Sequence, residues 1–241
     1  MIDFHCHILP GLDDGAQNLD ESLALARQCV DAGVDTVVAT PHGHGTIIDT
    51  LLPRRSEALQ TLAEALAKEQ IPLRIYPGLE YFADGHSVDM AVAHPDILCG
   101  VPGTPNRPLL LELSIDMDLH FVTDLLFMAQ LKGVPMVLAH PERYKNFRKS
   151  FQLLCDLMDK GLVLQFNSED FRKSFFHHAI PNLMLALIDH DPTRVVIGSD
   201  AHNSERRPAG LTMAQETITK SLGVMTWEQV SLKNAVELLG I

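Results

Sequence analysis

Residues 136–143 read MVLAHPER, four apolar residues followed by a histidine, a proline, a carboxylate and an arginine. On either side lie segments of helical period, 119–132 and 150–160, and each is followed directly by a glycine that can end a helix. A second apolar run begins soon afterwards, at 163–167. Short apolar runs that alternate with helices are typical of βα units around a parallel sheet, so this stretch predicts an α/β fold.

The same alternation continues along the whole chain. Most of the apolar runs are too continuous for half-solvated antiparallel strands, so both faces of the sheet are expected to be covered. The seven predicted strands lie at 2–5, 36–40, 73–79, 109–113, 136–139, 163–167 and 195–198. The predicted helices lie at 20–32, 54–69, 119–132, 150–160, an interval within 171–190, 204–222 and 226–239. The longest predicted loop is the Gly- and Pro-rich segment 99–108, and no repeat or linker interrupts the pattern, so we expect one domain over residues 1–241.

Composition restricts the class of protein. The 241 residues carry 31 Asp plus Glu against 19 Lys plus Arg, a net charge of −12, which argues against nucleic acid as a partner. No apolar run approaches the roughly 20 residues that span a bilayer, and the N-terminus lacks the pattern of a signal peptide. The four cysteines have no paired spacing, which favours reduced thiols. We therefore expect a cytoplasmic protein without membrane insertion. Its acidic amphipathic helices are expected to face the solvent around the barrel. The sequence does not decide whether the protein forms an oligomer.

Polar residues gather at the ends of the predicted strands, where barrel enzymes build their active sites. Six of the seven strands carry a histidine or a carboxylate there, and only 163–167 has neither. The candidates are His5, His7, His42, Glu80, Glu112, His140, Asp200 and His202.

Two pairs among these candidates, His5 with His7 and Asp200 with His202, are separated by a single residue. Side chains two positions apart in an extended chain point to the same side, so each pair can converge on a cation. Asp13 or Asp14 adds another carboxylate. Five histidines and up to four carboxylates without a thiolate suit Zn²⁺, Mn²⁺ or Fe²⁺ better than Ca²⁺ or a structural zinc. The set is large enough for more than one metal ion.

The sequence contains few of the motifs that are typical of other classes of hydrolase. No cysteine is followed by arginine after five intervening residues, and neither a GxSxG motif nor a phosphate-binding P-loop occurs. Asp116 and Asp118 approach an aspartyl-phosphate motif, but His120 occupies its last place. A metal-dependent amidohydrolase usually carries a lysine at a strand end, and none of these strand ends has one.

Six motifs of the chain resemble those of the polymerase-and-histidinol-phosphatase (PHP) superfamily. The likeness is greatest to the manganese-dependent tyrosine phosphatases of bacterial capsule and exopolysaccharide loci, the CpsB/YwqE-like group. The motifs are DFHCHILPGLDDGA at 3–16, VVATPH at 37–42, GLEY at 78–81, LLLEL at 109–113, AHPERY at 139–144 and GSDAHN at 198–203. They follow one another in the family's order, so the resemblance covers essentially the whole chain. One departure is Gly43, which stands where the family often has another histidine.

The resemblance implies a distorted (βα)7 barrel of the PHP type with three divalent metal ions, Mn²⁺ with Fe²⁺ or Zn²⁺ as alternatives. Carried over by position, one metal is held by His5, His7, Glu80 and Asp200, a second by Glu80, Glu112 and His140, and a third by Asp14, His42 and His202. Arg143 matches a phosphate-binding arginine. A second such arginine precedes Pro208, and of Arg206 and Arg207 we choose Arg207.

The implied activity is hydrolysis of phosphotyrosine on a protein, the tail of a bacterial tyrosine kinase that regulates exopolysaccharide or capsule synthesis. Two alternatives stay open. One is a phosphatase of a small metabolite such as histidinol phosphate, and the other is a metal-binding scaffold without catalysis.

Overall fold

The computed structural model describes residues 1–172 and 179–241. Its strands are all paired in parallel, as the continuous apolar runs indicate. They are β1 (Ile2–Cys6), β2 (Thr36–Ala39), β3 (His42–Gly43), β4 (Arg74–Pro77), β5 (Glu80–Phe82), β6 (Leu109–Glu112), β7 (Met136–Ala139), β8 (Val163–Asn167) and β9 (Val195–Gly198). The α-helices are α1 (Leu19–Asp31), α2 (Ile48–Lys68), α3 (Ser87–Ala93), α4 (His120–Lys132), α5 (Phe151–Asp159), α6 (Ala179–His190), α7 (Thr212–Leu222), α8 (Val224–Glu228) and α9 (Asn234–Leu239).

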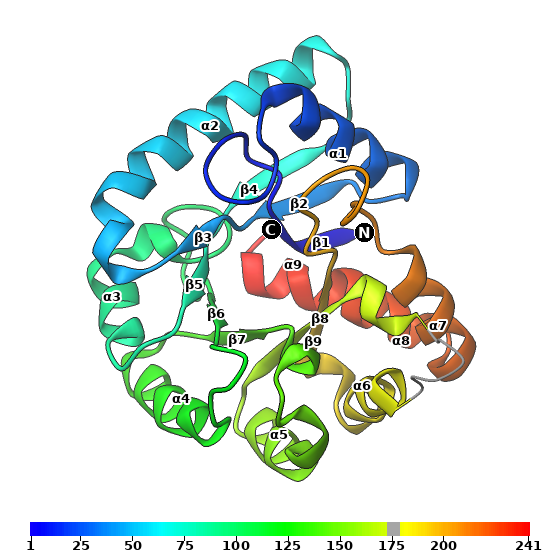
Figure 1. Ribbon diagram of the computed structural model, residues 1–241. Helices are drawn as coiled ribbons and strands as arrows, with labels where there is room; N and C mark the ends of the chain where they lie inside the picture. Colours follow the sequence, from blue (N-terminus) through cyan, green and yellow to red (C-terminus); the bar gives the residue numbers. More distant parts are fainter. Residues whose placement is uncertain (173–178) are drawn as a thin grey trace.

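The strands form a barrel with helices around it (Figure 1). They pair in two sheets, β1-β2-β4 and β3-β5-β6-β7-β8-β9, and β1 meets β9 through a bridge between Cys6 and Ala201. β2 and β3 follow each other along one side of the barrel, and β4 and β5 along the next. The nine strands of the described residues therefore make seven sides, and the predicted distorted (βα)7 barrel is confirmed.

Two sides of the barrel differ from the prediction because each consists of two short strands instead of one. The run predicted at 36–40 is continued by β3 after Pro41, and the run predicted at 73–79 ends at Pro77 before β5 begins at Glu80. Proline has no N–H to donate to a strand ladder, so β2 ends before Pro41, and Pro77 is the last paired residue of β4. The consequence is functional, because His42 and Glu80 then belong to the sheet that carries most of the strand ends.

The helix predictions need three corrections. The helix predicted at 204–222 begins at Thr212, because Asn203 accepts the backbone N–H of Arg206 at 2.7 Å and holds the preceding segment in a turn. α3 was not predicted, since it has only seven residues. α2 begins at Ile48 rather than after Pro53. The interval predicted within 171–190 contains α6, and its part at 173–178 lies outside the described residues.

Pro53 lies inside α2 and is exposed. Its ring nitrogen cannot donate to the carbonyl four residues earlier, at Asp49. A Pro53→Ala variant is expected to raise the free energy of unfolding by about 1–2 kcal/mol, because a helical N–H is restored and alanine favours the helix. Urea unfolding followed by circular dichroism measures the change. A variant less stable than the parent would contradict this expectation and show that Pro53 stabilises α2.

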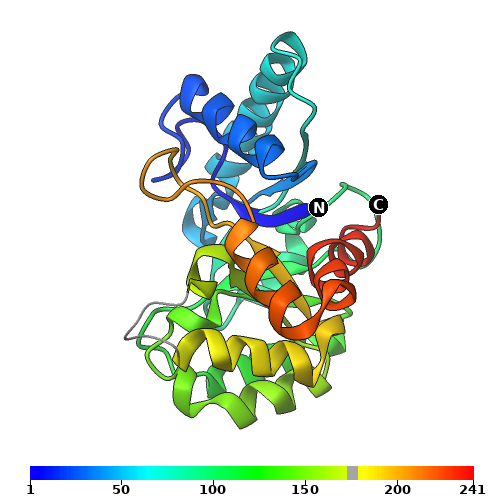
Figure 2. The same ribbon diagram turned by 90° about the vertical axis from the view of Figure 1, so that its right-hand side faces the viewer.

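The barrel interior is divided into an apolar and a polar part. The apolar part packs Phe4, Val38 and Leu110 with residues of neighbouring strands and is closed by Ala235 and Leu239 of α9. Figure 2 shows α9 at the opposite end of the barrel from the loops that follow β1 and β9. The polar residues are thereby confined to the end that those loops surround. Among the described residues, no helix combines the length and apolar character needed to cross a bilayer.

Candidate metal centre

All nine candidate ligands lie together at the carboxyl ends of the strands. They come from every side of the barrel except β8. β1 and the loop after it provide His5, His7 and Asp14, β3 provides His42, β5 Glu80, β6 Glu112, the end of β7 His140, and the segment after β9 Asp200 and His202. Four groups of three or four of these residues have ligand atoms within 4.8 Å of one another.

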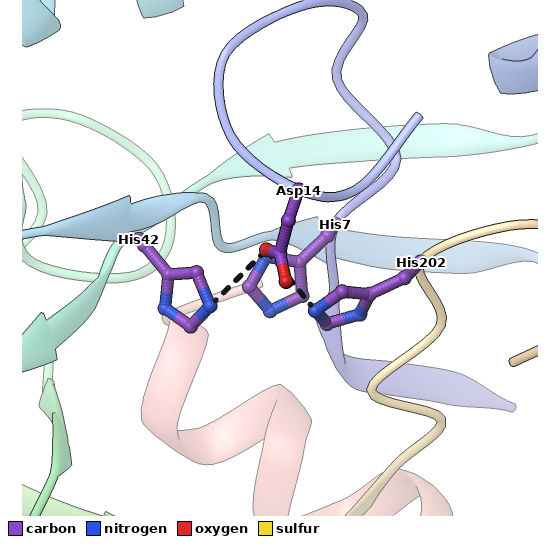
Figure 3. A group of neighbouring side chains, drawn as sticks. All are labelled: His7, Asp14, His42 and His202. Atoms are coloured by element: carbon purple, nitrogen blue, oxygen red, sulfur yellow. Dashed lines mark ion pairs between the residues drawn. The ribbon is translucent and has the colours of Figure 1, made fainter. Parts of the chain in front are cut away.

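One group contains His7, Asp14, His42 and His202 (Figure 3). Asp14 Oδ1 lies 3.4 Å from His42 Nε2 and 3.4 Å from His202 Nε2. Asp14 is largely exposed, whereas His7 and His202 are buried, so this group sits between the polar interior and the solvent. Of the two neighbouring aspartates that the sequence offered, Asp14 is the one within reach of two imidazoles.

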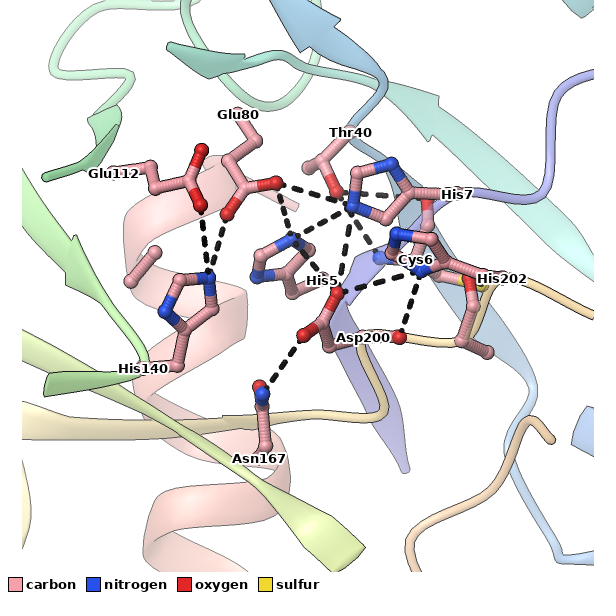
Figure 4. Close-up of polar contacts among 12 residues, drawn as sticks. His5, Cys6, His7, Thr40, Glu80, Glu112, His140, Asn167, Asp200 and His202 are labelled. Carbon is pink, nitrogen blue, oxygen red and sulfur yellow. Dashed lines mark hydrogen bonds and ion pairs between the residues drawn. The ribbon is translucent and has the colours of Figure 1, made fainter. Parts of the chain in front are cut away.

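Glu80 belongs to two of the other three groups (Figure 4). Its Oε2 lies 3.2 Å from His5 Nε2, 3.1 Å from His7 Nε2 and 3.0 Å from His42 Nδ1. Its Oε1 lies 2.7 Å from His140 Nε2. A single carboxylate thus faces nitrogens of four imidazoles.

These contacts fit a divalent cation better than a hydrogen-bond network. Glu80 Oε2 is buried and has no hydrogen-bond partner although three imidazole nitrogens surround it. His5 Nε2 and His7 Nε2 also face each other at 3.2 Å. A buried oxygen without a hydrogen bond is costly unless another positive partner satisfies it. Nitrogen and carboxylate donors in this ratio suit zinc, manganese or iron.

Two further histidine nitrogens are oriented by partners behind the ligands. His7 Nδ1 lies 2.7 Å from Asp13 Oδ2, and His202 Nδ1 lies 3.0 Å from the carbonyl oxygen of Asp200. Asp13 also accepts the backbone N–H of His42 at 2.9 Å. Such partners fix the tautomer and the ring orientation of a ligating histidine. Sequence reasoning named Asp13 only as an alternative ligand and did not find this positioning role.

The charges of the carboxylates depend on the surrounding imidazoles. Burial alone would raise the pKa of Glu80, but the charge of His5 and the hydrogen bond from His140 hold this pKa well below its ordinary value. Burial opposes ionisation of Asp200 as well, yet the positive fields of His5 and His7 keep its pKa low. Glu112 shows the opposite effect, because burial and the charge of Glu80 raise its pKa. The cluster therefore holds at least two ionised carboxylates in its buried part.

The backbone is strained at two of the ligands. His140 has φ +31° and Asp200 has φ +53°, both in the left-handed region that residues other than glycine rarely adopt. His140 directly follows the last residue of β7, and Asp200 lies two residues after the end of β9. At both positions the left-handed turn redirects the side chain. Strain of this kind is maintained where the surrounding structure requires it, which is common at functional sites.

A cavity of about 140 Å³ opens above these groups. Its lining combines candidate metal ligands, two arginine side chains and several apolar or aromatic side chains. The residues are Asp14, His42, Glu80, Glu112, Leu113, Ile115, His140, Arg143, Tyr144, Asp200, His202 and Arg207. His5 and His7 lie beneath it and are fully buried.

Two arginines border the cavity. Arg143 Nη1 donates to Asp200 Oδ2 at 2.8 Å, and Arg207 Nη2 lies 2.6 Å from the same oxygen. Arg143 is further held by Asp170 at 3.1 Å. Arg206, the reserve candidate, is exposed and does not line the cavity.

A parallel βα barrel with a cluster of histidines and carboxylates at the carboxyl ends of its strands is typical of metal-dependent barrel enzymes. Within this class, the chain belongs to the CpsB/CapC family of capsular polysaccharide synthesis, whose profile matches residues 1–240. The resemblance seen in the six sequence motifs is thereby confirmed.

Two relatives and one solved structure support this membership. Tyrosine-protein phosphatase YwqE from Bacillus subtilis (strain 168) is 33% identical over 223 residues, covering 92% of this chain and 85% of the relative. Tyrosine-protein phosphatase CpsB from Streptococcus pneumoniae is 25% identical over 244 residues, covering 99% of this chain and 98% of the relative. The solved structure, described as YwqE from Bacillus subtilis and CpsB from Streptococcus pneumoniae, unique metal-dependent tyrosine phosphatases, matches with a TM-score of 0.85 at 32% identity. This match covers 99% of this chain and 94% of the solved chain.

Proposed function

We propose that this protein is a metal-dependent phosphatase that hydrolyses phosphotyrosine on proteins. The observation that carries the proposal is the cavity in which seven of the nine potential metal ligands meet two arginine side chains, with His5 and His7 beneath it. The relatives named as tyrosine phosphatases cover nearly the whole chain, and their activity is the one this cavity can perform.

The residues fit three divalent ions, which we propose to be Mn²⁺, with Fe²⁺ or Zn²⁺ as alternatives. His5, His7, Glu80 and Asp200 would hold one ion; Glu80, Glu112 and His140 a second; and Asp14, His42 and His202 a third. When bound, such ions supply polarisation of the phosphoryl group and activation of the attacking water.

The chain itself supplies phosphate binding. Arg143 and Arg207 both reach Asp200 Oδ2, so their guanidinium groups are held at the edge of the cavity before substrate arrives. Each guanidinium has five N–H donors in a planar fork that can bind two phosphate oxygens at once, which lysine cannot do. The two arginines would therefore orient the phosphoryl group over the ligands and balance its charge.

The apolar part of the cavity lining suits an aromatic ring. Leu113, Ile115 and Tyr144 line it, and Ile115 is 58% exposed at the rim. A cavity of about 140 Å³ encloses a phosphoryl group and leaves most of a peptide outside. A phenolate leaving group has a conjugate acid of pKa about 10, so it needs less protonation than an alkoxide. These properties favour a phosphotyrosine side chain presented by a protein.

We further propose a partner and a location for this activity. The substrate would be the phosphorylated tail of a bacterial tyrosine kinase that controls exopolysaccharide or capsule synthesis, and the enzyme would act in the cytoplasm. The family's role in capsular polysaccharide synthesis supports this assignment.

Metal removal tests the proposed function. Purified protein treated with a chelator is expected to lose hydrolysis of a phosphotyrosine peptide by at least about 100-fold, since the ligands alone cannot activate water. Adding back Mn²⁺, Zn²⁺, Mg²⁺ or Fe²⁺ one at a time should restore activity, with Mn²⁺ the most effective. Histidinol phosphate serves as the competing substrate. Hydrolysis of that metabolite without hydrolysis of the peptide would contradict the substrate assignment, and bound metal without hydrolysis of either would indicate a scaffold.

A further inference from the structure

β8 is the side of the barrel without a candidate ligand, yet two polar side chains of this strand face the metal centre. Gln165 and Asn167 are both fully buried. They lie two positions apart, so they point to the same side of the strand as Val163, which packs in the barrel interior. A buried side-chain amide is costly unless its donors and acceptor are satisfied, so their partners are informative.

The two amides form a continuous chain of hydrogen bonds between two candidate ligands. His5 Nδ1 lies 2.7 Å from Gln165 Oε1. Gln165 Nε2 donates to Asn167 Oδ1 at 2.8 Å. Asn167 Nδ2 in turn donates to Asp200 Oδ2 at 2.8 Å (Figure 4). We call these two side chains the amide relay.

The contact with Asp200 determines the direction of the hydrogen bonds in the amide relay. Asp200 Oδ2 also accepts from Arg143 at 2.8 Å and lies 2.6 Å from Arg207, so this carboxylate is ionised and can only accept. Asn167 must then present its NH₂ group to Asp200 and its oxygen to Gln165. Gln165 must present its NH₂ group to Asn167 and its own oxygen to His5.

The other end of the relay selects the tautomer of His5. Because Gln165 offers an oxygen, His5 Nδ1 must carry the proton, and His5 Nε2 keeps its lone pair. That nitrogen is the one 3.2 Å from Glu80 Oε2 and 3.2 Å from His7 Nε2. The opposite tautomer would require both amides to turn over, which would bring Asn167 Oδ1 against the carboxylate of Asp200. We propose that Gln165 and Asn167 are positioning residues that set His5 in the tautomer required for metal binding.

The packing of the neighbouring strand leaves room for this relay. Gly198 of β9 lies between β8 and β1, and a Cβ atom there would be 2.6 Å from His5 Cβ and 2.9 Å from Gln165 Nε2. Asn167 is also held through its backbone, since its N–H donates to Glu142 Oε1 at 2.8 Å. The relay is thus built into three strand ends and is not a contact of mobile surface side chains.

The inference rests on the proposed metal centre but not on the proposed substrate. Its first test is the ring tautomer of His5 in metal-free wild-type protein, read from long-range ¹H–¹⁵N NMR correlations of ¹⁵N-labelled histidine. The spectra are recorded at a pH high enough for a neutral ring, because burial lowers the pKa of His5 but Glu80 and Asp200 raise it above its ordinary value. A protonated Nδ1 with an unprotonated Nε2 is expected. A His5 ring with the proton on Nε2 would overturn the proposal.

The second test uses variants of similar volume, Gln165→Met, Asn167→Leu and the double variant, titrated with Mn²⁺ alone against a chromophoric chelator. Each single variant is expected to weaken Mn²⁺ binding about 10- to 100-fold, as loss of a histidine-orienting partner typically does. The double variant should bind Mn²⁺ with the same affinity as the single variant that binds it more weakly, because both substitutions break the same series of hydrogen bonds. Effects that multiply, or affinities within twofold of wild type, would overturn the relay.

The matched control is Asn234→Leu. Asn234 is another buried amide, but it donates to the carbonyls of Pro192 and Val195, at the other end of β9. It should lower stability and leave Mn²⁺ affinity unchanged; an equal loss of affinity in this control would contradict a specific role for the relay. Wild-type protein that binds no metal would contradict the proposed function, and the tautomer measurement would still decide the relay.

Discussion

A Glu80→Gln variant is expected to lose metal ions and phosphatase activity together. Glu80 belongs to two of the four ligand groups, and its two oxygens face His5, His7, His42 and His140 at 2.7–3.2 Å. An amide has nearly the same shape but lacks the negative charge, and its NH₂ group repels a cation. We expect kcat/KM for a phosphotyrosine peptide to fall about 1,000-fold, equivalent to about 4 kcal/mol of transition-state stabilisation. Elemental analysis should show fewer metal ions per chain.

The fold should survive this change, since Glu80 is buried and glutamine removes a charge that burial opposes. Glu142→Gln is the matched control. Glu142 is equally buried, burial raises its pKa well above the ordinary value, and it does not line the cavity. Glutamine keeps an oxygen that can accept the backbone N–H of Asn167, so this variant should keep both metal and activity. A Glu80→Gln protein with a full complement of metal and normal kcat/KM would refute the central role of this carboxylate.

The strands β7, β8 and β9 could be predicted from the sequence with their observed bounds, because β7 and β9 are continuous apolar runs and β8 is apolar except for its two amides. The break after Pro77 could not, since the predicted run continues to Leu79. The two-residue strand β3 could not either, because neither His42 nor Gly43 is apolar. The start of α7 at Thr212 could not be predicted either. The side chain of Asn203 holds the preceding segment in a turn through a hydrogen bond, and the spacing of apolar residues carries no information about that bond.

The candidate site was more readily predicted than the segments around it. A histidine or carboxylate at a strand end can be recognised in the sequence as a candidate site residue, because such a side chain is unusual beside buried apolar residues. Neutral amides carry no such signal, so Gln165 and Asn167 were overlooked although they stand two apart in an otherwise apolar strand. The choices between Asp13 and Asp14, and between Arg206 and Arg207, depend on how a loop folds, and adjacent identical residues cannot be told apart without it.

An Arg143→Ala variant is expected to keep its metal ions and lose phosphate binding. Arg143 touches the ligand set only through Asp200 Oδ2, which also keeps its contact with Arg207 and its bond from Asn167. Its guanidinium is held at the cavity edge by Asp200 and Asp170, which places it for the phosphoryl oxygens. Charge-assisted bidentate bonds of this kind contribute several kcal/mol, so we expect kcat/KM to fall about 100-fold, with inhibition by inorganic phosphate weakened in parallel.

Three further arginine variants make this prediction specific to the cavity. Arg207→Ala should show a similar loss, because Arg207 shares the carboxylate oxygen with Arg143. Arg206→Ala should have little effect, since Arg206 is exposed outside the cavity, and Arg148→Ala provides a second exposed arginine as a control for net charge. The measurements are kcat and KM for the phosphotyrosine peptide, the inhibition constant of phosphate, and metal content. Normal turnover in Arg143→Ala, or a larger loss in Arg206→Ala than in Arg207→Ala, would assign phosphate binding to other residues. Loss of metal in Arg143→Ala would instead place this arginine in the support of Asp200, because an ionised carboxylate deprived of one guanidinium would then no longer hold its ion.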